Sequence, residues 1–252
     1  VVTLIDALAR DHDVALLNLH KDAPDVGGVM AVGAASAFSA TDLVNDDGDP
    51  AQTDDAKRLW PWFPVDGRWL AATATLCKDW QPDIVVVEYI RLAYLLAAVP
   101  TGVLTMLDSH DVMSQRMALF ATYGRTPSIT ISARNEAEIL RRFYIVIAIS
   151  QFDIHHMGDH LKISRLLYVP HVMTPVAQRV AGSADGRSLI FVAGDSDANR
   201  TGIRYFLKEI WPPLSRSYSL KVCGSICDDA IVSAARGVEP LGHVPDLAAE
   251  YA

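Results

Sequence analysis

Short apolar runs alternate along the chain with longer stretches of helical spacing. The runs of strand type occupy residues 14–19, 84–87, 103–107, 144–149 and 166–169. In the intervening stretches, apolar residues return every three or four positions, as they do on one face of a helix. Strand, helix and strand repeated at this interval predict parallel strands joined by right-handed crossovers. We therefore expect an α/β protein whose first part is a doubly wound sheet.

The composition changes at residue 173. Residues 173–187 hold Pro, Gly, Ser and Ala without a sustained apolar face, which is typical of a linker between domains. A second α/β unit starts at Ser188, with a helix over residues 202–210 that Pro212 and Pro213 are expected to stop. We predict a first domain over residues 1–172, which lacks its first strand, and a partial second domain over residues 188–252. The linker, residues 173–187, lies between them.

One long stretch, residues 21–64, is polar and rich in small residues, and no element is predicted in it. It ends in Trp60-Pro61-Trp62-Phe63. These aromatic residues can anchor a loop to the core or form an exposed recognition surface. We favour the anchor, because tryptophan side chains usually bury most of their area.

Composition narrows the class of protein. Of the 252 residues, 50% are hydrophobic and the formal net charge is −8. Such a chain can bury one large core or two ordinary ones, and its acidic balance argues against nucleic acid as a partner. The three cysteines form no disulfide framework and fit a reducing compartment. With neither an export signal nor a run that spans a bilayer, the cytoplasm is the predicted location.

The candidate chemistry lies where the run 103–107 ends, in Asp108-Ser109-His110-Asp111. Buried parallel strands deliver the residues that follow them to the ligand-binding edge of such sheets. There the imidazole of His110 can hydrogen-bond a ligand, while Asp108 or Asp111 fixes its other nitrogen. In the alternative interpretation His110 and Asp111 only cap the next helix, and Asp111 is the better cap.

Several motifs, in order, resemble the retaining glycosyltransferases of the GT-B fold, known as glycosyltransferase group 1 or family 4. The motifs are LDSHDVMSQR (107–116), VIAIS (146–150), YVPH (168–171), LIFVAG (189–194), NRTGI (199–203), WP (211–212), VCG (222–224) and LGHVPDL (241–247).

The resemblance implies a fold and a reaction. It implies two Rossmann-like domains of GT-B type, the second incomplete here. The first domain would bind the acceptor, which is a carbohydrate, a lipid-linked molecule or a small molecule. The second would hold a nucleotide-diphosphate sugar as co-substrate. Transfer would proceed with retention of configuration at the anomeric carbon and without a metal or other cofactor. The resemblance is also compatible with a peripheral association of the protein with the inner face of a membrane.

The resemblance also assigns residues in the first domain. His110 matches a family histidine that faces the donor sugar across the cleft, so we take His110 and Asp111 as the catalytic residues. Substrate binding is predicted for Ser109, Arg116, Ser150 and His171. Ser150 can equally be the N-cap of the next helix, and His171 stands in a Pro-His-Val turn where the family commonly has Pro-x-Gly.

In the second domain, the resemblance implies that the loop after Gly194 faces the nucleotide diphosphate. Arg200 would neutralise phosphate, because a guanidinium binds two oxygens at once. The alternative is a solvated arginine on the first turn of a helix. Nucleotide-sugar binding is predicted for Gly194, Asn199, Arg200, Gly202 and Gly224.

Two patterns that suggest metal are discounted. Asp195-Ser196-Asp197 has a D-x-D pattern, but it lies where the family has its phosphate loop. His156 and His160 are spaced i, i+4 without the glutamate of an H-E-x-x-H motif, which favours a polar helix face. No metal site is predicted.

The family's glycine-rich loop and its E-x7-E segment are absent from this sequence. The chain therefore looks like part of a longer enzyme, and we expect it to be weak or inactive alone. Two alternatives remain: a non-catalytic binding module of the same fold, and a sugar-nucleotide epimerase.

Overall fold

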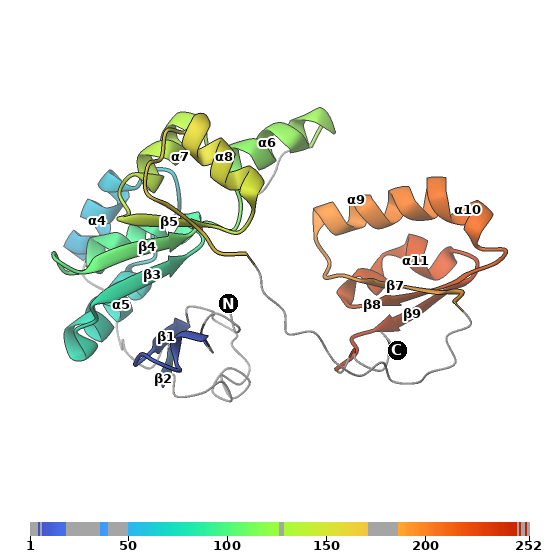
Figure 1. Cartoon of the computed structure of the whole chain (residues 1–252), viewed down its shortest axis with the longest axis horizontal. Coiled ribbons are helices and arrows are strands. Elements are labelled where there is room, and N and C mark those ends of the chain that lie inside the picture. Colours follow the sequence, from blue (N-terminus) through green and yellow to red (C-terminus); the bar gives the residue numbers. More distant parts are fainter. Residues whose placement is uncertain are drawn as a thin grey trace. The chain divides into compact units, whose positions relative to one another are not determined.

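A computed structural model describes residues 5, 7–18, 36–39, 50–125, 129–170, 186–245, 247 and 250. The chain divides into two compact units, Val1–Met173 and Thr174–Ala252. Each unit has its own hydrophobic core and its own parallel sheet (Figure 1). His171 and most of the predicted linker lie outside the described residues. The predictions made for them therefore stay predictions.

The first unit is built on a four-stranded sheet with the order β3-β4-β5-β6. All three strand pairs are parallel. The strands are β3 (Ile84–Glu88), β4 (Leu104–Asp108), β5 (Ile145–Ala148) and β6 (Leu166–Tyr168). Each coincides with a predicted apolar run, and the predicted α/β class with parallel strands is confirmed.

Helical segments precede this sheet and connect its strands. They are α4 (Pro50–Leu59), α5 (Gly67–Trp80), the 3₁₀ helix η1 (Ile90–Ala98), α6 (Met113–Thr122), α7 (Ala133–Leu140) and α8 (Gln151–Asp159). Polar caps start three of them, because a side-chain oxygen can accept from the free amides of the first turn. Asp66 accepts from the amide of Arg68, Ser132 from that of Asn135 and Ser150 from that of Asp153.

The aromatic sequence at residues 60–63 is a core anchor, as predicted. Trp60 is only 3% exposed and belongs to the core of the first unit, against which Trp62 and Phe63 pack. The guanidinium of Arg142 lies 4.3 Å from the ring centre of Trp60 and 5.4 Å from that of Trp62. These cation–π contacts attach the segment to the end of α7.

Two elements were missed in the polar stretch 21–64. They are α4 and the strand β2 (Ser36–Ser39), which pairs in parallel with β1 (Ala15–Asn18). The sequence of β2, SAFS, has too few apolar positions to show a strand period, and α4 has a mostly polar surface. Both elements depend on their neighbours, which a local pattern does not show.

The second unit has a three-stranded parallel sheet with the order β7-β8-β9. Its strands are β7 (Ser188–Val192), β8 (Ser219–Cys223) and β9 (Val238–Gly242). The short η3 (Ser225–Asp228) and α11 (Ala230–Ala234) follow β8. In the part of the chain that the structure describes, no helix is long and apolar enough to cross a membrane.

The prediction that Pro212 and Pro213 end a helix was wrong. Figure 1 shows one rod beside the sheet, in which α9 (Asp197–Tyr205) continues through the π-helical η2 (Phe206–Ile210) into α10 (Trp211–Leu214). Both prolines lie in the first turn of α10. The wider π turn changes the hydrogen-bond register just before them, and a missing N–H is tolerated in a first turn.

Gly224 joins β8 to η3 where the chain passes close to β7. Its φ is 99°, and a Cβ added there would lie 2.2 Å from the carbonyl oxygen of Ala193. Its amide donates to the carbonyl of Gly242 at 2.6 Å. Only glycine fits this contact among three strand ends.

We predict that Gly224→Ala destabilises the second unit by about 3 kcal/mol, because the methyl group collides with backbone at a strained φ. Faster hydrogen exchange of the β7 and β8 amides would measure the loss. Gly202→Ala is the matched control, because a Cβ at Gly202 meets nothing within 4 Å and alanine favours a helix. Equal protection in both variants would contradict the prediction.

Candidate functional site

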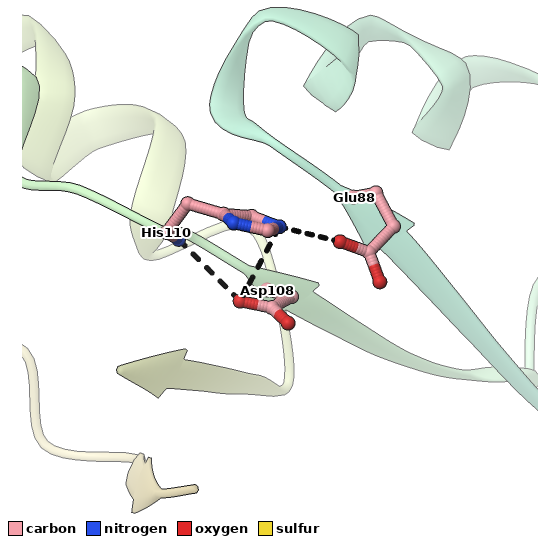
Figure 2. Close-up of side chains that lie close together, drawn as sticks. All are labelled: Glu88, Asp108 and His110. Atoms are coloured by element: carbon pink, nitrogen blue, oxygen red, sulfur yellow. Dashed lines mark hydrogen bonds and ion pairs between the residues drawn. The ribbon is translucent and has the colours of Figure 1, made fainter. Parts of the chain in front are cut away.

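The parallel register of β3 and β4 places two carboxylates side by side. Glu88 and Asp108 are register partners and each is the last residue of its strand. Because parallel strands end at the same edge, both side chains lie at the carboxyl edge of the sheet, where open α/β folds bind ligands. Figure 2 shows the two side chains facing the ring of His110.

His110 completes this arrangement. Its Nε2 lies 2.7 Å from Oε2 of Glu88 and 3.9 Å from Oδ1 of Asp108. Its backbone amide is 3.4 Å from the same Asp108 oxygen. An ionised carboxylate only accepts hydrogen bonds, so Nε2 carries the proton in the contact with Glu88. The side chains of His110 and Glu88 are 29% and 32% exposed, which leaves them accessible from solvent.

The backbone at this edge is unusual. Among the non-glycine residues that the structure describes, four have positive φ, and two of them, Gln81 and Lys162, lie just past the C-terminal ends of helices, where this conformation is common. The other two are Tyr89, at 75°, and His110, at 58°. Neither lies past the C-terminal end of a helix: Tyr89 is the N-cap residue of η1, and His110 stands in the turn after β4. Strained residues of this kind concentrate at functional sites.

Neighbouring residues hold the strained segment in place. The amide of Tyr89 donates to the carbonyl of Asp108 at 2.8 Å, and the Tyr89 ring meets the imidazole edge to face with centres 6.0 Å apart. Ser109 is 2% exposed, and its hydroxyl donates to the carbonyl of Ile147 at 2.8 Å. Ser109 therefore joins β4 to β5, and its predicted contact with substrate stays a prediction.

The interpretation of Asp111 as a helix cap was wrong. Its carboxylate forms an ion pair with Arg116 at 2.8 Å. Within the described part of the chain, it neither caps α6 nor forms a hydrogen bond with the imidazole. The N-cap residue is Val112, whose side chain makes no cap bond. The predicted roles of Asp111 in catalysis and of Arg116 in substrate binding remain predictions.

Glu136 of α7 caps α6 instead. Its carboxylate accepts from the amides of Met113 and Ser114 at 2.6 and 2.9 Å. The residue is 1% exposed, and burial raises the pKa of its carboxyl above the ordinary value, against the opposing effect of the hydrogen bonds from Ser114 and Met113. Through this contact α7 determines where α6 begins, three residues after His110.

Ser150 follows β5 and is the N-cap of α8. Its hydroxyl accepts from the amide of Asp153 at 3.1 Å and donates to the Asp153 carboxylate at 2.6 Å. The capping interpretation is thus confirmed, and the predicted substrate contact is untested.

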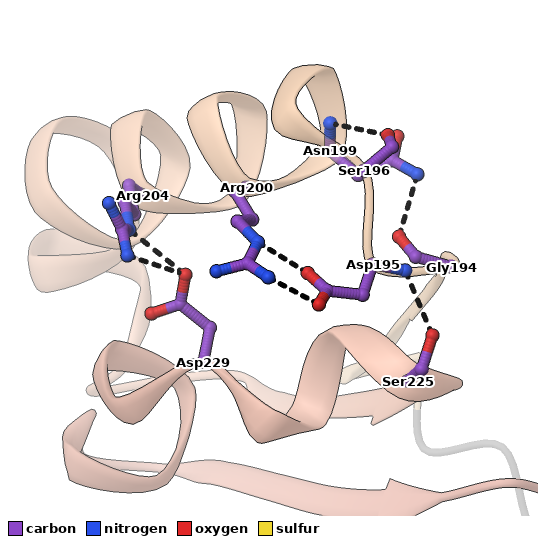
Figure 3. Close-up of polar contacts among 8 residues, drawn as sticks. All are labelled: Gly194, Asp195, Ser196, Asn199, Arg200, Arg204, Ser225 and Asp229. Atoms are coloured by element: carbon purple, nitrogen blue, oxygen red, sulfur yellow. Dashed lines mark hydrogen bonds and ion pairs between the residues drawn. The ribbon is translucent and has the colours of Figure 1, made fainter.

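In the second unit Gly194 lies in the loop between β7 and α9, and Asn199 and Arg200 lie near the start of α9 (Figure 3). Ser196 caps α9 by accepting from the amide of Asn199 at 3.3 Å. The side-chain amide of Asn199 donates to the carbonyl of Gly194 at 2.9 Å, and the amide of Asp195 donates to the hydroxyl of Ser225 at 2.9 Å. The loop is therefore held by polar contacts with α9 and with the start of η3.

Arg200 forms a two-bond contact with the carboxylate of Asp195. One helical turn further along, Arg204 contacts Asp229 at 2.9 Å. Both arginines therefore already have an anionic partner. Asp195 occupies the side of the Arg200 guanidinium that is predicted to bind the phosphate of the ligand. Gly202 lies on the same helix with open space around its Cα.

No protein-family model matches the chain, and no curated protein matches it. Several solved structures are similar to it, and two of them are described here. One is the glycotransferase of kitacinnamycin, at 15% identity and a TM-score of 0.49, over 98% of this chain and 68% of that one. The other is the glycosyltransferase SnogD from Streptomyces nogalater, at 17% identity and a TM-score of 0.43, over the same shares.

Sequence reasoning missed Glu88, Tyr89 and Glu136. A signal existed for Glu88, because it is the one polar residue that ends the run IVVVE of a strand neighbouring β4. Placing that run in register with LTMLD would have set Glu88 beside Asp108. No local signal exists for Glu136, since its partners lie 22 and 23 residues away.

We predict a pH-dependent contribution of Glu136 to stability. Because its pKa is raised in the folded state, the folded protein keeps the proton to a higher pH than the unfolded chain. The free energy of unfolding therefore falls as pH rises from about 4.5 through the raised value. Urea unfolding of the wild type and of Glu136→Gln, between about pH 4 and about pH 8, measures this effect. The free energy of unfolding of the wild type should fall relative to that of Glu136→Gln as the pH rises. Parallel curves for the two proteins would contradict it.

Proposed function

We propose that the protein is a glycosyltransferase that moves a sugar from a nucleotide-diphosphate donor to a hydroxyl of a carbohydrate, lipid-linked or small-molecule acceptor. The observation that carries the proposal is His110, held 2.7 Å from Glu88 at the carboxyl edge of a parallel sheet. The sequence motifs on both sides of His110 and in the second unit support the same reaction. Retention of anomeric configuration, independence of metal and a cytoplasmic location belong to this proposal.

His110 has the role of a sugar contact in this proposal. Because Nε2 carries a proton toward Glu88, the neutral ring has its lone pair on Nδ1. That nitrogen can accept a hydrogen bond from a sugar hydroxyl. Glu88 is a positioning residue, since it holds the tautomer and the ring orientation rather than touching the sugar.

The loop before α9 supports a place for the diphosphate. Its backbone is held by Ser196, Asn199 and Ser225, and Arg200 offers a two-bond face for an anion. Free amides at a helix start add a partial positive charge. Asp195 competes for the same guanidinium, so phosphate must displace it or bind beside it.

We predict that His110→Ala lowers kcat/KM for sugar transfer about 100-fold in the natural full-length protein, since the lost hydrogen bond acts on the reacting sugar. Transfer is measured with UDP-, GDP- and TDP-sugars and a panel of hydroxyl acceptors. His155→Ala is the matched control, because His155 is exposed on α8, where its ring contacts the carbonyl of Gln151.

The configuration of the product is read by NMR of its anomeric proton. An inverted product would contradict retention and would indicate that Nδ1 removes the acceptor proton. Product formed from donor alone would favour an epimerase.

We predict that Asp195→Asn strengthens binding of UDP or GDP about tenfold, because Arg200 loses its internal carboxylate. Arg200→Ala should weaken binding by a similar factor. Asp197→Asn is the control, since it removes the same charge from the first residue of α9, whereas the two-bond partner of Arg200 is Asp195. Isothermal titration calorimetry gives the affinities, and equal affinities for Asp195→Asn and Asp197→Asn would contradict a phosphate role for Arg200.

A further inference from the structure

We propose that Glu88, Asp108 and His110 form a binding site for a first-row transition-metal ion, Zn²⁺ by preference. Each residue offers one ligand atom, and these atoms all lie within 4.8 Å of one another. In the part of the chain that the structure describes, this is the one group of three such residues that meets this spacing. Figure 2 shows the three side chains converging from the ends of β3 and β4 and the turn that follows β4.

The distances fit a zinc ion after small movements. Zinc bonds to histidine nitrogen and carboxylate oxygen are about 2.0 Å long, so two ligand atoms of a tetrahedral site lie about 3.3 Å apart. Here Nε2 of His110 lies 2.7 Å from the Glu88 oxygen and 3.9 Å from the Asp108 oxygen. These two values bracket the required one, and a change of well under 1 Å brings each of them to it, while the ligand oxygens of the two carboxylates lie within 4.8 Å of one another.

The charge of the cluster favours a cation. Two ionised carboxylates and a neutral imidazole carry a charge of −2. Among the described residues, no lysine or arginine forms an ion pair with Glu88 or Asp108. This contrasts with the second unit, where Asp195 and Asp229 are each paired with an arginine. The site is therefore negatively charged and partly open to solvent. An ion can enter it and keep water molecules at its remaining coordination positions.

The donor set selects the kind of ion. Magnesium and calcium prefer oxygen ligands alone, whereas an imidazole with two carboxylates suits zinc and its first-row neighbours. The positive φ of His110 turns the imidazole back over the strand ends, which brings the nitrogen into the group. Bound metal would offset the cost of that backbone conformation.

Metal binding would also change the chemistry of the ring. An ion on Nε2 replaces the proton that Nε2 donates to Glu88, and the neutral ring then carries its proton on Nδ1. The Nδ1 atom changes from an acceptor to a donor. This consequence rests on the proposed function: if Nδ1 accepts from a sugar hydroxyl, Zn²⁺ inhibits transfer rather than supporting it.

The test is a calorimetric Zn²⁺ titration of the purified, chelator-treated protein near neutral pH. We expect the His110→Ala variant to bind one Zn²⁺ ion fewer than the wild type, or to bind it with a Kd about 100-fold higher or more. The nearly isosteric Glu88→Gln and Asp108→Asn should each raise Kd about tenfold or more, which keeps the test valid if His110→Ala folds poorly. X-ray absorption of the zinc complex should show nitrogen and oxygen ligands with one imidazole.

The double variant His156→Ala/His160→Ala is the matched control. It removes the other close histidine pair, whose ring centres are 4.7 Å apart on α8, and should leave Zn²⁺ binding unchanged. Unchanged binding in His110→Ala together with loss in this double variant would overturn the proposal.

Zn²⁺ is then added to the transfer assay as a separate measurement. Binding at His110 without inhibition would count against the proposed sugar contact and leave the metal site standing. Absence of binding at His110 would remove the metal site and leave the proposed transfer untouched.

Discussion

The parallel pairing of β3 with β4 is the constraint on which the first unit depends. It sets Glu88 opposite Asp108 at the end of two apolar strands, and everything polar at that edge follows from this register. A slip of β3 by one residue against β4 would take Glu88 out of register with Asp108 and turn its carboxylate to the other side of the sheet. The buried residues Val87 and Leu107 just before them hold the register, because each would lose its place in the core.

The turn after β4 converts this pair of carboxylates into a site. His110 takes a left-handed conformation, and Glu136 ties the start of α6 to α7 through two buried hydrogen bonds. A buried carboxylate is costly unless it is hydrogen-bonded. Here that group determines where the helix begins, so the position of His110 depends on a residue of another helix as well as on its own strand.

The second unit reaches a similar arrangement by different contacts. Gly224 allows β8 to approach the end of β7, and Ser225 then holds the loop that precedes α9. The arginines of α9 are paired with Asp195 and Asp229. In the first unit two carboxylates share one imidazole, whereas in the second each carboxylate has its own guanidinium. The two edges are therefore suited to different ligands: a hydroxyl or a cation in the first, an anion in the second.

The sequence by itself determined the α/β class, the parallel strands and the chemical interest of His110, because apolar runs and the polar residues that end them are local features. It also indicated Ser150 as a cap and Trp60 as a core residue. It did not determine which carboxylate holds the imidazole, which residue caps α6, or how far the helix at Pro212 extends. Those outcomes depend on strand register, on a contact between α6 and α7 and on a π turn, all of which exist only once distant segments have packed together.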